Sequence, residues 1–272
     1  MNKNLLLIFL LIFVLSDSVS KSPEAVQADE YELVFSDEFN LPNGSQPDST
    51  KWGRSVRYTS IWNRWVSQSP RVVYIDKGHL VCKAIPNRTE KSDTAAMLTG
   101  AIETLNKYSF QYGKVEVRLK TNTQRGNFPA AWLSPQPGGI DSRYGEIDIF
   151  ETFGNIGCSQ HTVHNHLTTI LKKKGPENEF RKKIRVDRWH IYSIEWSAEK
   201  IIWFIDGEKV AEYHKSNDPQ LLADGQWTFD RPFFLRLNQS VGDGSYEVMI
   251  PDVTKEYETR FDWIRVYQKR KR

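Results

Sequence analysis

Residues 145–151 read Gly-Glu-Ile-Asp-Ile-Phe-Glu, and this stretch places three carboxylates inside an otherwise apolar, β-branched run. Side chains alternate between the two faces of a β-strand, so Glu146 and Asp148 share one face. Regular alternation would send Glu151 to the opposite face, but a one-residue β-bulge after Asp148 would return it to the same side. The stretch therefore predicts a bulged strand with its three acids together.

Three carboxylates on one strand face are expected in only a few types of site. Carboxylates on one face repel each other, which raises the pKa of one group while another stays ionised, as proton transfer requires. A metal cage is the other arrangement that tolerates such crowding, and an exposed strand with scattered acids is the plain structural alternative. The opposite face of the strand would be entirely apolar, because it carries Ile147, Ile149 and Phe150. An apolar face of this kind argues against an exposed strand.

Short runs rich in Val, Ile, Phe, Trp and Tyr recur along the chain, separated by turn residues. Apolar and charged side chains alternate in residues 114–120, so this strand should have one face in the core. Asp206-Gly207 predicts a tight hairpin, and a weak helical stretch lies near residues 218–223. We expect an all-β protein, a two-sheet β-sandwich of the jelly-roll type. The predicted strands include residues 71–75, 80–84, 114–120, 146–150, 190–195, 200–205 and 260–267.

The 272-residue chain suits one secreted domain. Residues 1–20 read as a signal peptide, because Lys3 precedes a short apolar core that ends in small residues. That core is shorter than the roughly 20 residues of a membrane span. We therefore expect a secreted or periplasmic protein with a flexible lead at residues 21–30, one domain at 31–268 and a basic tail at 269–272.

Net charge and cysteine content argue against a nucleic-acid-binding protein, a disulfide-rich scaffold and a zinc protein. A net charge of +3 is too small to require an acidic partner such as nucleic acid. Cys82 and Cys158 do not make a disulfide scaffold or a zinc site, and we expect both to be buried free thiols, with pairing left open. The basic runs at 172–174, 181–185 and 269–272 are expected to be solvated, although they also suit a sulfated or sialylated polymer.

The acidic stretch resembles the signature of glycoside hydrolase family 16 in its bulged form, Glu-x-Asp-x-x-Glu. The resemblance implies a single catalytic domain at residues 31–268, with a concanavalin A-like jelly roll of the lectin/glucanase type and a substrate cleft on its concave sheet. Further segments match in family order, and they are residues 35–39, 51–52, 99–103, 112–118, 127–133, 189–196, 204–207 and 261–267.

The resemblance also implies a role for each acid: Glu146 is the nucleophile, Glu151 the general acid/base and Asp148 their assistant. Glu146 must be ionised to attack the anomeric carbon, whereas Glu151 must carry a proton. The charge of Asp148 raises the pKa of Glu151, and the three groups should titrate as a coupled set. Carboxyl groups about 5 to 5.5 Å apart support retention of configuration, and neighbours on one bulged strand cannot lie much further apart.

Aromatic side chains are candidates for stacking on sugar rings. Trp132 matches the family's cleft tryptophan, while sugar contact and simple packing stay open for Trp62 and Trp65. His164 fits the family histidine that faces the catalytic strand, with a structural role equally open. The tryptophans at 196, 203 and 263 are expected in the core. The predicted substrate-binding residues are Trp132, Phe128, His164, Tyr144, Trp62, Trp65 and Asn238.

No cofactor is expected for catalysis. The resemblance implies a structural calcium ion away from the cleft, because Glu38, Gly78 and Asp262 stand in matching positions and oxygen ligands suit that ion. The expected partner is a β-linked poly- or oligosaccharide. Neither nucleic acid binding nor a membrane span is expected, and the protein should be a monomer.

Departures from the laminarinase pattern bear on the substrate. Residues 140–145 lack the usual Trp-Pro, Phe128 replaces a tryptophan, and residues 238–243 differ from Asn-x-Ala-Val-Gly-Gly. Residues 163–174 resemble gut-bacterial members that act on galactose-containing host glycans. We expect a retaining endo-β-glycosidase for a galactose- or glucose-containing chain, with poly-N-acetyllactosamine or mucin-type β-galactosidic bonds preferred. The alternatives are an endo-β-1,3-glucanase (laminarinase), an agarase- or carrageenase-type hydrolase, a transglycosylase and a non-catalytic carbohydrate-binding protein.

Overall fold

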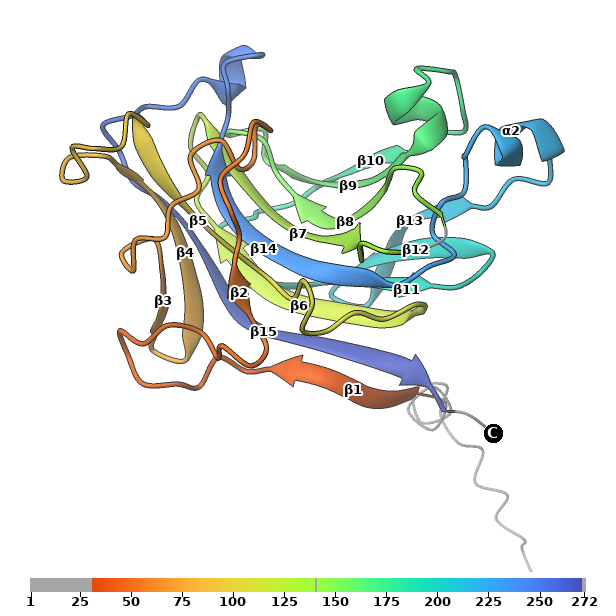
Figure 1. Cartoon of the computed structure of the whole chain (residues 1–272), viewed down its shortest axis with the longest axis horizontal. Helices are drawn as coiled ribbons and strands as arrows, with labels where there is room; N and C mark the ends of the chain where they lie inside the picture. The colour runs from red at the N-terminus through yellow and green to blue at the C-terminus, as the bar shows by residue number, and fades with distance from the viewer. Residues whose placement is uncertain (1–30, 140, 271–272) are drawn as a thin grey trace, which may run out of the picture.

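The computed structural model describes residues 31–139 and 141–270. Their strands form two stacked antiparallel layers, and the predicted all-β jelly roll is confirmed (Figure 1). The predicted signal peptide and flexible lead, residues 1–30, lie outside the described residues, as does the end of the basic tail. The strand β15 continues to Lys269, one residue beyond the predicted end of the domain.

Strand order within the layers places distant parts of the sequence side by side. The first layer contains β10 (Glu179–Lys183), β9 (Cys158–Asn165), β8 (Gly145–Glu151), β7 (Asn127–Pro135), β14 (Phe233–Val241) and β5 (Met97–Glu103). The second contains β4 (His79–Pro86), β15 (Tyr257–Lys269), β6 (Gly113–Thr121), β11 (His190–Trp196), β12 (Lys200–Ile205) and β13 (Glu208–His214). At the margins, β1 (Tyr31–Asp37) pairs with β15, β2 (Gly53–Arg54) with β5, and β3 (Val73–Asp76) with β4. Short helices are η1 (His166–Ile170), α2 (Pro219–Ala223) and η2 (Glu247–Met249).

The hydrophobic core lies between the layers, where each strand contributes one face. Alternate residues of β6 are buried, as the sequence predicts, and Trp196 and Trp203 belong to the core. Trp263 was expected in the core, and this prediction is wrong. Its side chain is only half-buried, and the Arg265 guanidinium lies over the indole, 4.2 Å from the ring centre. The register of β15 slips between Phe261 and Trp263, and this irregularity turns the indole outward.

The hairpin and the short helix predicted from the sequence are both present in the structure. The β12–β13 hairpin turns at Asp206 and Gly207, whose φ angles of 51° and 84° suit an Asp-Gly pair. The weak helical stretch is α2, capped by the Asp218 side chain. Both cysteines are free thiols, as expected; Cys82 is buried, but Cys158 is partly exposed.

Candidate active site

The three acids of β8 face one side because the strand contains a bulge. Pairing with β9 slips by one residue between Asp148 and Glu151. Residues 160, 162 and 164 stand opposite the acids, and they share a face because they are two residues apart on a regular strand. The predicted bulge is therefore confirmed. The register pairs are Glu146 with His164, Asp148 with Thr162, and Glu151 with Gln160.

Two buried side chains hold the bulge from the core. His161 Nδ1 donates to the carbonyl oxygen of Ile149 at 2.8 Å, and Trp203 Nε1 donates to that of Asp148 at 2.8 Å. Burial lowers the pKa of His161 to about 4, so the ring is neutral at neutral pH and carries its proton on Nδ1. His161 is not among the site residues predicted from the sequence. Its odd-numbered position, alternating with Gln160 and Thr162, is the signal that places it on the core side.

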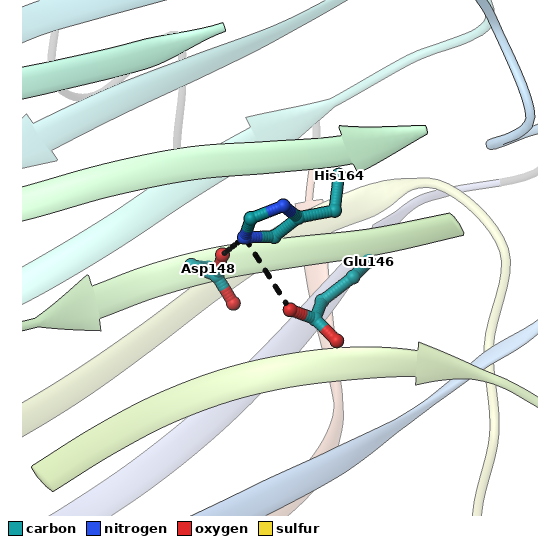
Figure 2. Close-up of side chains that lie close together, drawn as sticks. All are labelled: Glu146, Asp148 and His164. Carbon is teal, nitrogen blue, oxygen red and sulfur yellow. Dashed lines mark ion pairs between the residues drawn. The ribbon is translucent and has the colours of Figure 1, made fainter. Parts of the chain in front are cut away.

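A histidine from the neighbouring strand lies against two of the acids. His164 Nε2 is 3.3 Å from Asp148 Oδ2 and 3.6 Å from Glu146 Oε1. Figure 2 shows the imidazole ring pointing toward both carboxylates. Burial disfavours the imidazolium, but the carboxylates of Asp148 and Glu146 outweigh it and raise the pKa of His164 to about 9. The ring is therefore cationic at neutral pH and offsets part of the negative charge.

The acids differ in how far their environment opposes ionisation. Burial and the charge of Asp148 raise the pKa of Glu146 to about 7, against the pull of His164. Burial also raises the pKa of Asp148. For Glu151, burial and the charges of the other two acids raise the pKa well above its usual range. The site thus favours an ionised Glu146 beside a protonated Glu151, the division that acid–base catalysis needs.

Ligand atoms of Glu146, Asp148 and His164 lie within 4.8 Å of one another, a spacing that would also admit a metal ion. A metal requires a neutral imidazole, however, and the two carboxylates favour the imidazolium. We therefore assign this cluster to charge and proton control.

A second cluster lies across β7 and β14. Arg236 is opposite Trp132, which is opposite Asp148, so all three residues share the face that carries the acids. The Arg236 guanidinium lies 4.9 Å from the centre of the partly exposed Trp62 ring and 4.8 Å from that of Trp132. It also donates to Glu103 and to Ser134. Arg236 is not among the site residues predicted from the sequence, because only the strand pairing brings it beside these tryptophans.

The predicted aromatic platform needs revision in detail. Trp132 lies within β7, and it is only 5% exposed. Its Nε1 donates to Asn238, whose side chain is fully buried. The sequence predicts Asn238 as a substrate contact, whereas the structure makes it a support for Trp132. Trp62 packs edge-on against Trp132 and presents more surface.

The remaining predicted contacts fall into two groups. Tyr144 is 38% exposed, and its hydroxyl donates to Glu146 Oε2 at 2.8 Å. Phe128 is buried against Phe153, and Trp65 packs on a small separate cluster of the core. The geometry therefore unites Tyr144 with the acids, and sugar contact by Phe128 and Trp65 stays a prediction.

Two of the three predicted calcium ligands, Glu38 and Asp262, have other partners, and the third is Gly78. Glu38 accepts two hydrogen bonds from Arg265, both at 2.9 Å, and Asp262 is paired with Arg118. Calcium needs free oxygen atoms, which these ion pairs occupy. Calcium binding here stays a prediction that the arrangement does not support.

Two surface hollows lie apart from the acids. Their volumes are about 1030 and 660 Å³, and both are lined by β11, β12 and the ends of β1 and β15. Neither contains a predicted site residue. The acids instead lie on a sheet face where Tyr144 and His164 are partly exposed.

Comparison with known proteins agrees with this geometry. Residues 64–264 match the Glycosyl hydrolases family 16. The chain belongs to this family. Family membership places it among the glycosidases, as predicted, and the jelly roll is the family fold.

Relatives within the family are named for different polymers. A keratan-sulfate endo-1,4-beta-galactosidase of Sphingobacterium multivorum is 33% identical over 89% of this chain, which spans just over half (56%) of that protein. A beta-glucanase of Rhodothermus marinus is 30% identical, with 96% of this chain and 93% of the relative covered. The laminarinase structure from Rhodothermus marinus has a TM-score of 0.76 at 27% identity, covering 89% of this chain and 98% of its own.

Helices are few and short in the described part of the chain. None of them has the length and apolar character needed to cross a membrane.

Proposed function

We propose that this chain is a secreted, retaining endo-β-glycosidase that cleaves β-linked glycans containing galactose or glucose. The observation that carries the proposal is the bulge in β8, which brings Glu146, Asp148 and Glu151 to one face. Family membership supplies the reaction class, and the differing pKa shifts of the acids support their separate roles.

In the first step, a Glu146 carboxylate oxygen attacks the anomeric carbon while the glycosidic C–O bond breaks. Glu151 transfers its proton to the departing oxygen, so the leaving sugar departs with a neutral hydroxyl group. Glu146 loses its negative charge when it forms the ester, and the neighbouring charges of Asp148 and His164 partly compensate for this loss. The product is a glycosyl ester on Glu146 and an ionised Glu151.

In the second step, Glu151 accepts a proton from water, whose oxygen attacks the same anomeric carbon. The ester C–O bond breaks, Glu146 leaves as a carboxylate, and Glu151 regains its proton. Two inversions at one carbon give net retention. Early products should therefore be β-anomers in proton NMR spectra, and α-product appearing first would contradict this mechanism.

For the substrate, we favour β-galactosidic bonds of the poly-N-acetyllactosamine or mucin type. The 33%-identical relative carries the name of a keratan-sulfate endo-galactosidase, and residues 163–174 resemble members that act on galactose-containing glycans. A β-1,3-glucan is the second candidate, because a relative covering almost the whole chain is named a beta-glucanase.

The test combines a substrate screen with one variant. The protein is incubated with keratan, mucin, laminarin, lichenan and agarose, and products are sized by mass spectrometry; cleavage only of laminarin and lichenan would reverse the preference. Glu146→Gln should lower the rate at least about a thousandfold while the fold is retained. Glu177→Gln, at an exposed position, is the matched control. Near-normal turnover by Glu146→Gln would remove that residue as nucleophile.

A further inference from the structure

The two oxygens of the Glu146 carboxylate have different neighbours. Oε2 accepts a hydrogen bond from the Tyr144 hydroxyl at 2.8 Å. Oε1 faces His164, whose Nε2 is 3.6 Å away, and forms no hydrogen bond with it. The phenol therefore binds one oxygen and leaves the other for reaction.

Tyr144 belongs to a turn that is held at several points of its backbone. Thr228 Oγ1 donates to the Tyr144 carbonyl oxygen at 2.9 Å. The Arg231 guanidinium donates to the carbonyl oxygens of Asp141 and Arg143. Asp141 in turn accepts from the Arg143 backbone and guanidinium. These bonds fix the chain immediately before the catalytic strand.

Gly145 links this turn to β8, and there is no space for a larger residue. A Cβ atom there would lie 2.9 Å from Thr228 Oγ1 and 3.2 Å from Arg231 Nη2. The close approach keeps the turn against its supports, so the direction of the Tyr144 side chain is set by packing as well as by hydrogen bonds.

Several charged groups act on Glu146. Asp148 on the same strand disfavours ionisation, while His164 on β9 and Arg236 on β14 favour it. Glu151, which the site keeps protonated, adds negative charge only after it has given up its proton, and Glu179 acts on Glu151 and His164. Tyr144 is the neutral donor in this set, and burial together with the charge of Glu146 raises its phenol pKa, so it keeps its proton.

We propose that Tyr144 is a positioning residue for the nucleophile, holding Oε2 so that Oε1 faces the reacting carbon. This inference rests on the proposed function of Glu146. A hydrogen bond to a carboxylate stabilises the charged form, so the phenol also favours the ionised nucleophile before attack. The same bond stabilises the carboxylate when it is released from the glycosyl ester in the second step.

The kinetic test is Tyr144→Phe, which removes only the hydroxyl. The acid limb of kcat/KM against pH should move up by about one pH unit, and kcat should fall about tenfold with KM nearly unchanged. Tyr108→Phe is the control, because the buried Tyr108 hydroxyl has no hydrogen-bond partner in the described chain. An unmoved acid limb, or a loss confined to KM, would overturn the positioning role.

A second measurement does not depend on turnover. The ¹³C carboxyl resonance of Glu146, assigned by its absence in Glu146→Gln, is titrated in the wild type and in Tyr144→Phe. A higher pKa in the variant supports the inference even if no glycan is hydrolysed, and equal pKa values overturn it. Hydrolysis failing in the wild type would count against the proposed function alone.

Discussion

Glu146 and Glu151 carry the same chemical group, and their surroundings give it different proton affinities. Each carboxyl is disfavoured as an anion by burial and by the charge of Asp148. Only Glu146 has compensation from Tyr144, His164 and Arg236, which favour its ionised form. The assignment of nucleophile and acid therefore depends on neighbours from three strands rather than on the residues themselves.

His164 provides a test at the scale of the residue. With a pKa of about 7, Glu146 becomes protonated as the pH falls through that value, so the rate should fall on the acid side. His164→Gln removes the imidazolium, which raises the pKa of Glu146 and should move the acid limb of kcat/KM up by about one pH unit. His214→Gln, on an exposed part of β13, is the control. The role of His164 would be refuted by superimposable pH profiles.

At the scale of the element, the bulge in β8 is the feature that creates the site. Without the extra residue, Glu151 would face the core and the acids could not act together. At the bulge, the carbonyl oxygens of Asp148 and Ile149 accept hydrogen bonds from the side chains of Trp203 and His161, respectively. The backbone groups that the bulge leaves unpaired therefore find donors in the core. A distortion that breaks strand pairing is thus stabilised by the layer behind it.

His161→Ala tests this support. The variant loses a buried donor and leaves a cavity, so the free energy of unfolding should fall by about 2–4 kcal/mol. Hydrogen exchange at the amides of residues 149–151 should accelerate more than at β12. His161→Phe fills the space without restoring the donor and separates packing from hydrogen bonding. Full protection of these amides in both variants would show that the bulge does not need His161.

At the scale of the whole molecule, the sandwich keeps three acids in a setting that opposes their ionisation. A group whose pKa is raised on folding contributes stability below its unfolded pKa and loses it as the pH rises through the folded pKa. Glu151 is such a group, and its ionisation therefore costs the folded protein stability at high pH. The site is maintained by the rest of the core, which packs the two layers together.

Glu151→Gln should therefore raise the thermal midpoint at pH 9 by at least about 2 °C and change it little at pH 4. The reason is that glutamine does not ionise, so the pH-dependent cost disappears. The measurement is calorimetric unfolding across this pH range, with Glu177→Gln as the control. Equal midpoints for wild type and variant at pH 9 would show that ionisation of Glu151 does not lower the stability of the fold.

Local patterns were sufficient for much of the fold. The alternation in residues 114–120 predicted the exposed and buried faces of β6, and Asp206-Gly207 predicted the hairpin, because both signals depend only on strand periodicity and turn preference. Trp263 was predicted wrongly, since its outward direction follows from a register slip in β15 that composition does not reveal.

By itself, the sequence determined the chemistry of the site: three acids at a spacing that requires a bulge to unite them. Only the tertiary structure decided their environment. It set the contacts that His164 and Tyr144 make with the acids, and it brought Arg236 to the same face. It also placed His161 and Trp203 beneath the bulge and buried Asn238 behind Trp132. The physical reason is that charge interactions and burial depend on distance in space, which strand pairing sets between residues far apart in the chain.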